Sequence, residues 1–247
     1  MRGVALSQKD DSVLFSINQI QNASLNCASE SADAVDALGT PIATFYRAKS
    51  AEFSAENALF DMSLMATQLG TKKKVASATA KITVPAMETF TVAEGGKYEL
   101  KHTPKVIPTE IYALNGDSTF GTKYAKATAA SATEFSIADK TISLPTGVTA
   151  GTDMFVMYEY ETENAVEVVN SATEFPTGCK FVMEVLGCDV CDQTNLIYAY
   201  VIFNNFKLSP DFDWSVATDG AHPFSGKAQQ DYCDKEKRLF SIIHRRG

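Results

Sequence analysis

Cysteine and histidine are the residue types of this 247-residue chain whose spacing could support chemistry. Cys188 and Cys191 form its one CxxC spacing, which is half of a structural zinc site or a thiol pair for redox chemistry. Further candidates for a ligand set are Cys27, Cys179, Cys233 and His222. The CxxC lies between two β-type runs rather than before a helix, and a second CxxC is missing. The residues favour a hairpin turn that carries two thiols over a zinc site or redox pair. We therefore expect no metal and no cofactor.

The sequence signals for a catalytic site are equally weak. The histidines His102, His222 and His244 lie far apart, and the chain has no Gly-x-Ser-x-Gly elbow, phosphate-binding loop or dinucleotide fingerprint. Alternate carboxylates in 159–163 share one face of a strand, which is typical of a solvated edge. The sequence predicts a protein that is not an enzyme.

An aromatic cluster follows the CxxC region, with members Phe203, Phe206, Phe212 and Trp214. Such rings could form a stacking platform for sugars or bases, or they could serve as core or interface anchors. The net charge of −8 and the lack of interleaved arginines favour anchors.

The composition describes the kind of chain that must position these residues. It has 30 acidic and 22 basic residues, a pI near 5.0 and 45% hydrophobic residues. These values indicate a folded protein and argue against nucleic-acid binding over the whole surface. No apolar run is long enough for a membrane helix, and the start lacks the apolar run of a secretory signal. We expect an intracellular protein with reduced thiols and a bias toward sheet.

The residue patterns predict a mainly β fold with one helix. Helical spacing of apolar residues predicts a helix over 55–69, with Ser54 as its N-cap and Gly70 at its end. The segment 18–38 reads as a loop or extended arm. Strands are predicted over 13–17, 42–54, 97–100, 110–114, 134–137, 154–160, 165–169, 180–186, 196–203 and 238–243.

Turn signals divide the middle of the chain, among them Val84-Pro85, Gly95-Gly96 and Asn115-Gly116. They predict that 81–162 is an inserted, immunoglobulin-like β-sandwich module. Residues 1–80 and 163–247 would together form a discontinuous β-sandwich or barrel domain.

The last 50 residues carry a resemblance. A strand over 200–210, the segment Phe224-Ser225-Gly226-Lys227-Ala228 and a terminal strand resemble the C-terminal end of phage tail tube proteins, in which an F-x-G-x-A segment occurs. The helix after a strand is similar to the single helix of that fold. The inserted module departs from a minimal tube protein and would be displayed outward.

The resemblance implies a virion structural protein of the phage tail, made in the host cytoplasm. Its partners would be copies of itself in helically stacked hexameric rings, together with sheath or baseplate proteins. DNA would pass through without specific binding, and an acidic lumen would repel its backbone. The expected inter-subunit contacts are Asn18, Gln19, Asn26, Phe206, Trp214 and Phe224. Two alternatives stay open: a capsid decoration or other head or tail surface protein, and a zinc- or thiol-dependent protein using Cys188 and Cys191.

Overall fold

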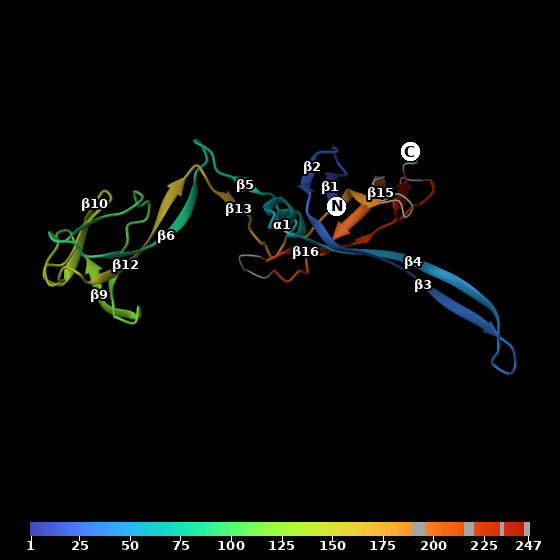
Figure 1. Ribbon diagram of the computed structural model, residues 1–247, viewed down its shortest axis with the longest axis horizontal. Helices are drawn as coiled ribbons and strands as arrows, with labels where there is room; N and C mark the ends of the chain where they lie inside the picture. Colours follow the sequence, from blue (N-terminus) through green and yellow to red (C-terminus); the bar gives the residue numbers. More distant parts are fainter. Residues whose placement is uncertain (189–195, 215–219, 233–234, 245–247) are drawn as a thin grey trace. The chain divides into compact units, whose positions relative to one another are not determined.

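The computed structural model describes residues 1–188, 196–214, 220–232 and 235–244. Within these residues the protein consists of seventeen β-strands and one short helix, so the predicted mainly β fold is confirmed. The chain forms two compact units (Figure 1): Met1–Lys73 with Val168–Gly247, and Lys74–Glu167. Each unit has its own hydrophobic core.

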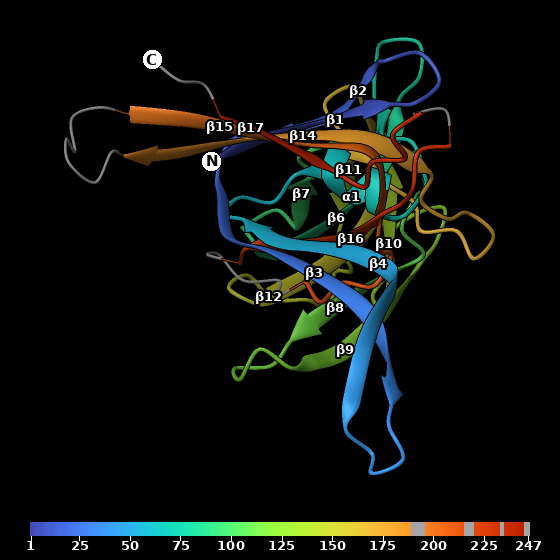
Figure 2. The ribbon, with the colours of Figure 1, turned by 90° about the vertical axis from the view of Figure 1, so that its right-hand side faces the viewer.

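The first unit is built on one antiparallel sheet. Its elements are β1 (Arg2–Ser7), β2 (Val13–Ile17), β3 (Ile20–Val35), β4 (Pro41–Asn57), α1 (Met62–Gln68), β14 (Gly178–Cys188), β15 (Leu196–Leu208), β16 (His222–Ala228) and β17 (Ser241–His244). The strand order is β2-β1-β14-β15-β16-β4-β3, and β17 pairs with β15 off this path. Figure 2 shows β3 and β4 running together as a long ribbon. The described sheet therefore ends in β2 on one side and β3 on the other.

A phenylalanine core fills the inner face of this sheet. Its fully or nearly fully buried rings are Phe15, Phe53, Phe181, Phe203, Phe206 and Phe224. Phe53 lies among them, with ring centroids 5.8 Å from Phe181 and 5.9 Å from Phe224. Both of these pairs are tilted, with interplanar angles of 50°, in keeping with the tendency of packed aromatic rings to avoid a face-to-face sandwich. The core thus joins strands from both ends of the chain.

The predicted helix over 55–69 is wrong in its first half. Strand β4 continues to Asn57, because Ala51, Phe53 and Ala55 alternate toward the core with the period of a strand. Helix α1 begins after Asp61, whose carboxylate accepts hydrogen bonds from two backbone N–H groups of the first turn. Asp61 therefore takes the capping role expected of Ser54. Gly70 does end the helix, with a φ of 73° that favours glycine.

The segment 18–38 is mostly strand. Of the two readings left open for it, the loop is wrong and the extended arm is confirmed, since β3 pairs with β4 along nearly its whole length. Its residues are rich in Ser, Asn and Ala, which have weak β propensity, and pairing with β4 overrides that preference.

Several other strands follow the predictions, with changes at the ends. Strands β2, β4, β8, β12, β14 and β15 contain the runs expected of them, whereas the terminal strand β17 begins only at Ser241. The run 165–169 keeps strand pairing at Val166–Glu167 alone. Pro85 was a predicted turn residue, yet it lies inside β6, an edge strand in which a missing N–H costs no ladder bond.

The second unit has a seven-stranded sheet and a two-stranded one. Its strands are β5 (Lys74–Val75), β6 (Ile82–Thr91), β7 (Lys97–Glu99), β8 (Glu110–Leu114), β9 (Phe120–Lys126), β10 (Glu134–Ala138), β11 (Thr141–Ser143), β12 (Asp153–Thr162) and β13 (Val166–Glu167). The larger sheet has the order β6-β12-β8-β9-β10-β11-β7, and β5 pairs with β13. Strand β12 lies between β6 and β8, as its apolar run predicts. The immunoglobulin-like identity of this unit stays a prediction.

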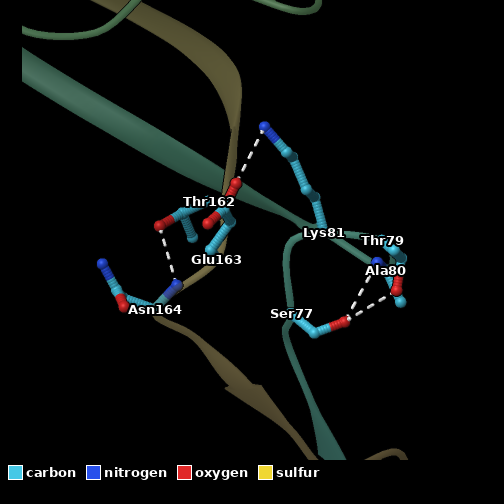
Figure 3. Close-up of polar contacts among 7 residues, drawn as sticks. All are labelled: Ser77, Thr79, Ala80, Lys81, Thr162, Glu163 and Asn164. Atoms are coloured by element: carbon cyan, nitrogen blue, oxygen red, sulfur yellow. Dashed lines mark hydrogen bonds and ion pairs between the residues drawn. The ribbon is translucent and has the colours of Figure 1, made fainter.

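Polar contacts hold the two chain segments where they enter and leave the larger sheet (Figure 3). Lys81 pairs with Glu163 at 3.2 Å across the start of β6 and the end of β12. A tight turn precedes them, in which the Ala80 N–H donates to the hydroxyl of Ser77 at 3.1 Å. Both contacts are exposed, so they fix the path of the chain more than they stabilise the fold.

Candidate assembly surface

The outer part of the β3–β4 ribbon is the most unusual surface of the first unit. We call residues 27–50 the arm, and every residue in it is exposed. Figures 1 and 2 show the arm running out beyond the other strands of its unit. Its exposed large apolar side chains are Val35, Leu38, Ile42, Phe45 and Tyr46, which are 55–91% exposed. A two-stranded ribbon with both faces in water is marginally stable by itself, so these exposed side chains make the arm the candidate surface for contact with another chain.

The two faces of the arm differ in chemistry. Cross-strand register places Ala32 opposite Phe45 on one face, with the ion pair of Glu30 and Arg47 at 3.3 Å further along. The other face carries Tyr46 and, beside it, Asp33 opposite Thr44. Exposed ion pairs contribute little to stability, so the backbone pairing of β3 and β4 is the main interaction that holds the arm within this chain.

The β3–β4 ladder has three register shifts, of which one lies between Ala34 and Val35 near the turn and the other two lie closer to the core. The register shifts between Gln21 and Ser24, and again between Ala28 and Glu30. Each of these two shifts coincides with a residue of positive φ: Asn22 at 51° in β3 and Ala48 at 51° in β4. Bulges increase the local twist and bend a strand. Asparagine tolerates this backbone well, whereas alanine adopts it at a cost. The bulge at Ala48 lies where the ribbon leaves the core.

The base of the arm is firmly anchored. Ala51, Phe53 and Ala55 are at most 4% exposed, and Phe53 contacts four core phenylalanines. Along β4, every residue up to Ser50 is exposed, and buried residues alternate with exposed or partly exposed ones from Ala51 onward, shortly after the bulge at Ala48. The arm is therefore an exposed ribbon that extends from a part of β4 that is packed in the core. Sequence reasoning missed its apolar members, although Phe45 and Tyr46 in a predicted strand next to a polar segment were a usable signal.

The six residues predicted as inter-subunit contacts fall in two environments. Asn18 and Gln19 are exposed in the turn between β2 and β3, and Asn26 is exposed on β3. Trp214 is 38% exposed. Phe206 and Phe224 are 0% and 2% exposed in the core, so they leave almost no surface for a neighbour. Of the predicted aromatic cluster, Phe203 and Phe206 are core residues of this chain.

A buried polar group lies beneath helix α1, next to this core. His222 is fully buried; its Nδ1 accepts from the Asp61 N–H at 3.3 Å, and its Nε2 donates to the Gln68 side-chain oxygen at 2.8 Å. Burial lowers the pKa of His222, against an opposing effect of the Asp61 carboxylate. Phe60 stacks between His222 and Trp214, with centroid distances of 5.1 and 4.4 Å. This group ties the start of the helix to β16.

Of the cysteine candidates, the structure describes the side chains of two: Cys27 is exposed and Cys179 is buried. Cys179 is buried and its thiol donates to the Phe206 carbonyl oxygen, while burial raises its pKa to about 12. A metal ligand must be a thiolate, so this environment disfavours coordination by Cys179. Cys191 and Cys233 lie outside the described residues, as does the side chain of Cys188. Within the described part of the chain, no three His, Cys, Asp or Glu side chains are grouped as metal ligands. No described helix has the length and apolar character needed to cross a membrane.

The fold and the unpartnered arm describe a β protein whose distinctive surface is suited to contact with other chains rather than to holding a small molecule. A family comparison agrees: the model of the YomU/Tube protein family matches residues 3–241, so the chain belongs to this family. The resemblance to phage tail tube proteins is thereby confirmed, and the chain is a structural protein of that class. Among the curated proteins, none matches this chain.

Proposed function

We propose that this protein self-assembles into hexameric rings that stack helically and form the phage tail tube through which DNA passes. Membership of the YomU/Tube protein family supports a structural protein of the phage tail tube. The observation that carries the proposal is the arm, whose apolar side chains are exposed on a ribbon that its own chain does not cover. In the assembly, a neighbouring subunit covers this surface.

The open ends of the sheet support pairing within a ring. Strands β2 and β3 end the described sheet of the first unit, and an edge strand presents unpaired backbone donors and acceptors. If β2 of one subunit pairs with β3 of the next, the sheet continues around the ring. Asn18, Gln19 and Asn26 lie at or beside these edges and remain our proposed contacts. Phe206 and Phe224 act indirectly, by holding β15 and β16 in place.

The charge of the chain suits a passage for DNA. With a net charge of −8, the subunit has no general attraction for phosphates, and acidic residues facing the lumen repel the DNA backbone. DNA then passes without specific binding. The other partners are sheath or baseplate proteins of the tail, the protein is made in the host cytoplasm, and the second unit is an inserted module displayed outward.

Electron microscopy of the concentrated full-length chain tests the proposal. We expect tubes of stacked rings with six subunits each. Phe45→Asp should shift the protein toward single subunits, because it places a charge on the surface of the arm that a neighbouring subunit would cover in the assembly. Phe120→Asp is the matched control: Phe120 is 61% exposed in the second unit, against 63% for Phe45. A protein that stays monomeric at all concentrations contradicts the proposal.

The alternatives give different results in the same preparation. A capsid decoration or other surface protein would bind a virion surface without forming tubes. A zinc-dependent protein would contain stoichiometric zinc that is lost in Cys188→Ser or Cys191→Ser, measured by elemental analysis of the purified chain.

A further inference from the structure

We propose that the tip of the arm of one copy docks in a lysine-lined hollow at the base of the arm of another copy. The inference rests on the proposed function, because it names the surface that receives the arm in the assembly. Three observations support it: lysines line the hollow, the tip carries carboxylates and an exposed leucine, and the ribbon is too long for the tip to reach the hollow of its own chain.

The hollow lies beside the base of the arm and has a volume of about 520 Å³. Strand β4, strand β16 and the segment that follows β16 line it. Its charged lining residues are Lys49, Lys227, Lys237 and Glu52. Lys227 pairs with Glu52 at 2.8 Å, so the lining carries two lysines beyond that pair. Leu239 and Ala228 add an apolar wall. The hollow therefore suits an acidic segment that carries an apolar side chain.

The tip of the arm has that chemistry. Asp36 accepts hydrogen bonds from the N–H groups of Leu38 and Thr40, both at 2.9 Å, and so shapes the turn. Asp33 accepts from the Thr44 hydroxyl at 2.7 Å. These donors are uncharged, whereas the third acid of the arm, Glu30, pairs with Arg47. Two carboxylates are thus left to meet two lysines, and Leu38, which is 91% exposed, is placed to meet Leu239.

The geometry of the ribbon excludes docking within one chain. Strand β4 begins at Pro41, and its eight residue steps to Lys49 span about 26 Å at about 3.3 Å per residue, so the tip beyond Pro41 lies at least that far from its own hollow. Folding back would break the β3–β4 ladder. A tip and a hollow on every copy form a head-to-tail contact, which generates rings or helical polymers when it is repeated. This is the kind of contact that a tube needs.

Zero-length cross-linking of the wild-type polymer tests the contact directly. Equal amounts of ¹⁵N-labelled and unlabelled full-length protein are assembled together, treated with a carbodiimide and analysed by mass spectrometry. We expect Asp33 or Asp36 to be joined to Lys49, Lys227 or Lys237 in peptide pairs of mixed isotope composition. Tip carboxylates joined to lysines elsewhere, or joined only within one copy, would overturn the inference.

Charge reversal gives an independent test. Lys49→Glu with Lys237→Glu should raise the concentration needed for assembly at least tenfold, measured by sedimentation. Asp33→Lys with Asp36→Asn should do the same, because asparagine keeps the turn of residue 36 and removes its charge. Combining all four changes should restore much of the lost assembly. The matched control is Lys97→Glu with Lys126→Glu, which makes the same charge change on exposed lysines of the second unit.

The outcomes separate this inference from the proposed function. If the wild-type chain forms no polymer, both fail. If it polymerises and the hollow variant assembles as well as the control, only the docking site is wrong, and another partner occupies the hollow. A combined variant that melts like the wild type but fails to assemble also contradicts the inference. Circular dichroism melting of every variant checks that each one folds.

Discussion

The Nε2 atom of His222 lies 2.8 Å from the side-chain oxygen of Gln68, and both residues are fully buried between the sheet and helix α1. The arrangement requires a neutral imidazole, because the other ring nitrogen accepts a hydrogen bond from the Asp61 N–H. Burial lowers the pKa of His222 in the folded state. In the unfolded chain this pKa returns to about 6.5.

Acidification should therefore destabilise the first unit through His222. As the pH falls from about 6.5 toward the lowered pKa, the unfolded chain binds a proton that the folded chain does not. The free energy of unfolding therefore decreases as the pH decreases. We expect the wild type to lose free energy of unfolding in this window, and His222→Gln to flatten the slope. Urea unfolding at several pH values measures this dependence of the free energy of unfolding on pH. His102→Gln should keep the slope, because it leaves His222 in place; equal slopes in both variants would refute the assignment.

Gly226, the glycine of the F-x-G-x-A segment, should resist substitution. A Cβ at this position would lie 2.5 Å from the Phe206 ring and 2.6 Å from the Lys207 carbonyl oxygen. The carbonyl belongs to the paired strand and cannot move away. We expect Gly226→Ala to lower the free energy of unfolding by about 3 kcal/mol, the upper range for overpacking. Ser225→Ala, at the adjacent position, should change it by less than about 0.5 kcal/mol. Chemical denaturation compares the two.

Tyr158 should be important for the second unit. Its hydroxyl donates to the carboxylate of Glu88, a 4% exposed residue that also accepts from Tyr98 at 2.7 Å. Burial raises the pKa of Glu88, but the bonds from Tyr158 and Tyr98 outweigh it and hold this pKa below its usual range. Tyr158→Phe should cost about 1–3 kcal/mol of stability, because it leaves a buried carboxylate with fewer donors.

The same substitution should raise the pKa of Glu88, which carboxyl NMR titration can follow. A carboxylate with a lowered pKa stabilises the fold above its ordinary pKa, and this contribution is lost as the pH falls through the folded value. The variant should therefore lose less stability in acid than the wild type. Tyr112→Phe is the control, since its hydroxyl donates to the carboxylate of Glu110, which is only partly buried, whereas Glu88 is buried. A Glu88 pKa that does not change in Tyr158→Phe contradicts this account.

The bulge at Ala48 should be relieved by glycine. Its φ of 51° costs an alanine about 1 kcal/mol, whereas glycine adopts it freely. Ala48→Gly should slow hydrogen exchange of the arm amides up to several-fold. Ala32→Gly, in the regularly paired part of the neighbouring strand β3, should speed exchange, because glycine weakens an ordinary strand. Faster exchange in both variants would show that the bulge is not strained.

Residue patterns by themselves determined the β class, many of the strands and the family. The alternation in β12 and the apolar runs of β14 and β15 are local signals, and the F-x-G-x-A segment carried the resemblance without any contact information. The glycine in that segment now has a physical reason, which is the carbonyl of Lys207 on the neighbouring strand.

Tertiary structure decided where local patterns were ambiguous or misleading. Ala55 fits a helical stripe and a strand alternation equally well, and only the packing of Phe53 in the core selects the strand. The Ser- and Asn-rich segment after β2 has little propensity of its own, so pairing with β4 makes it a strand. Phe206 and Phe224 were expected to be contacts but are buried, whereas Phe45 is exposed. Burial depends on which strands meet, and strands 150 or more residues apart meet only in the folded chain.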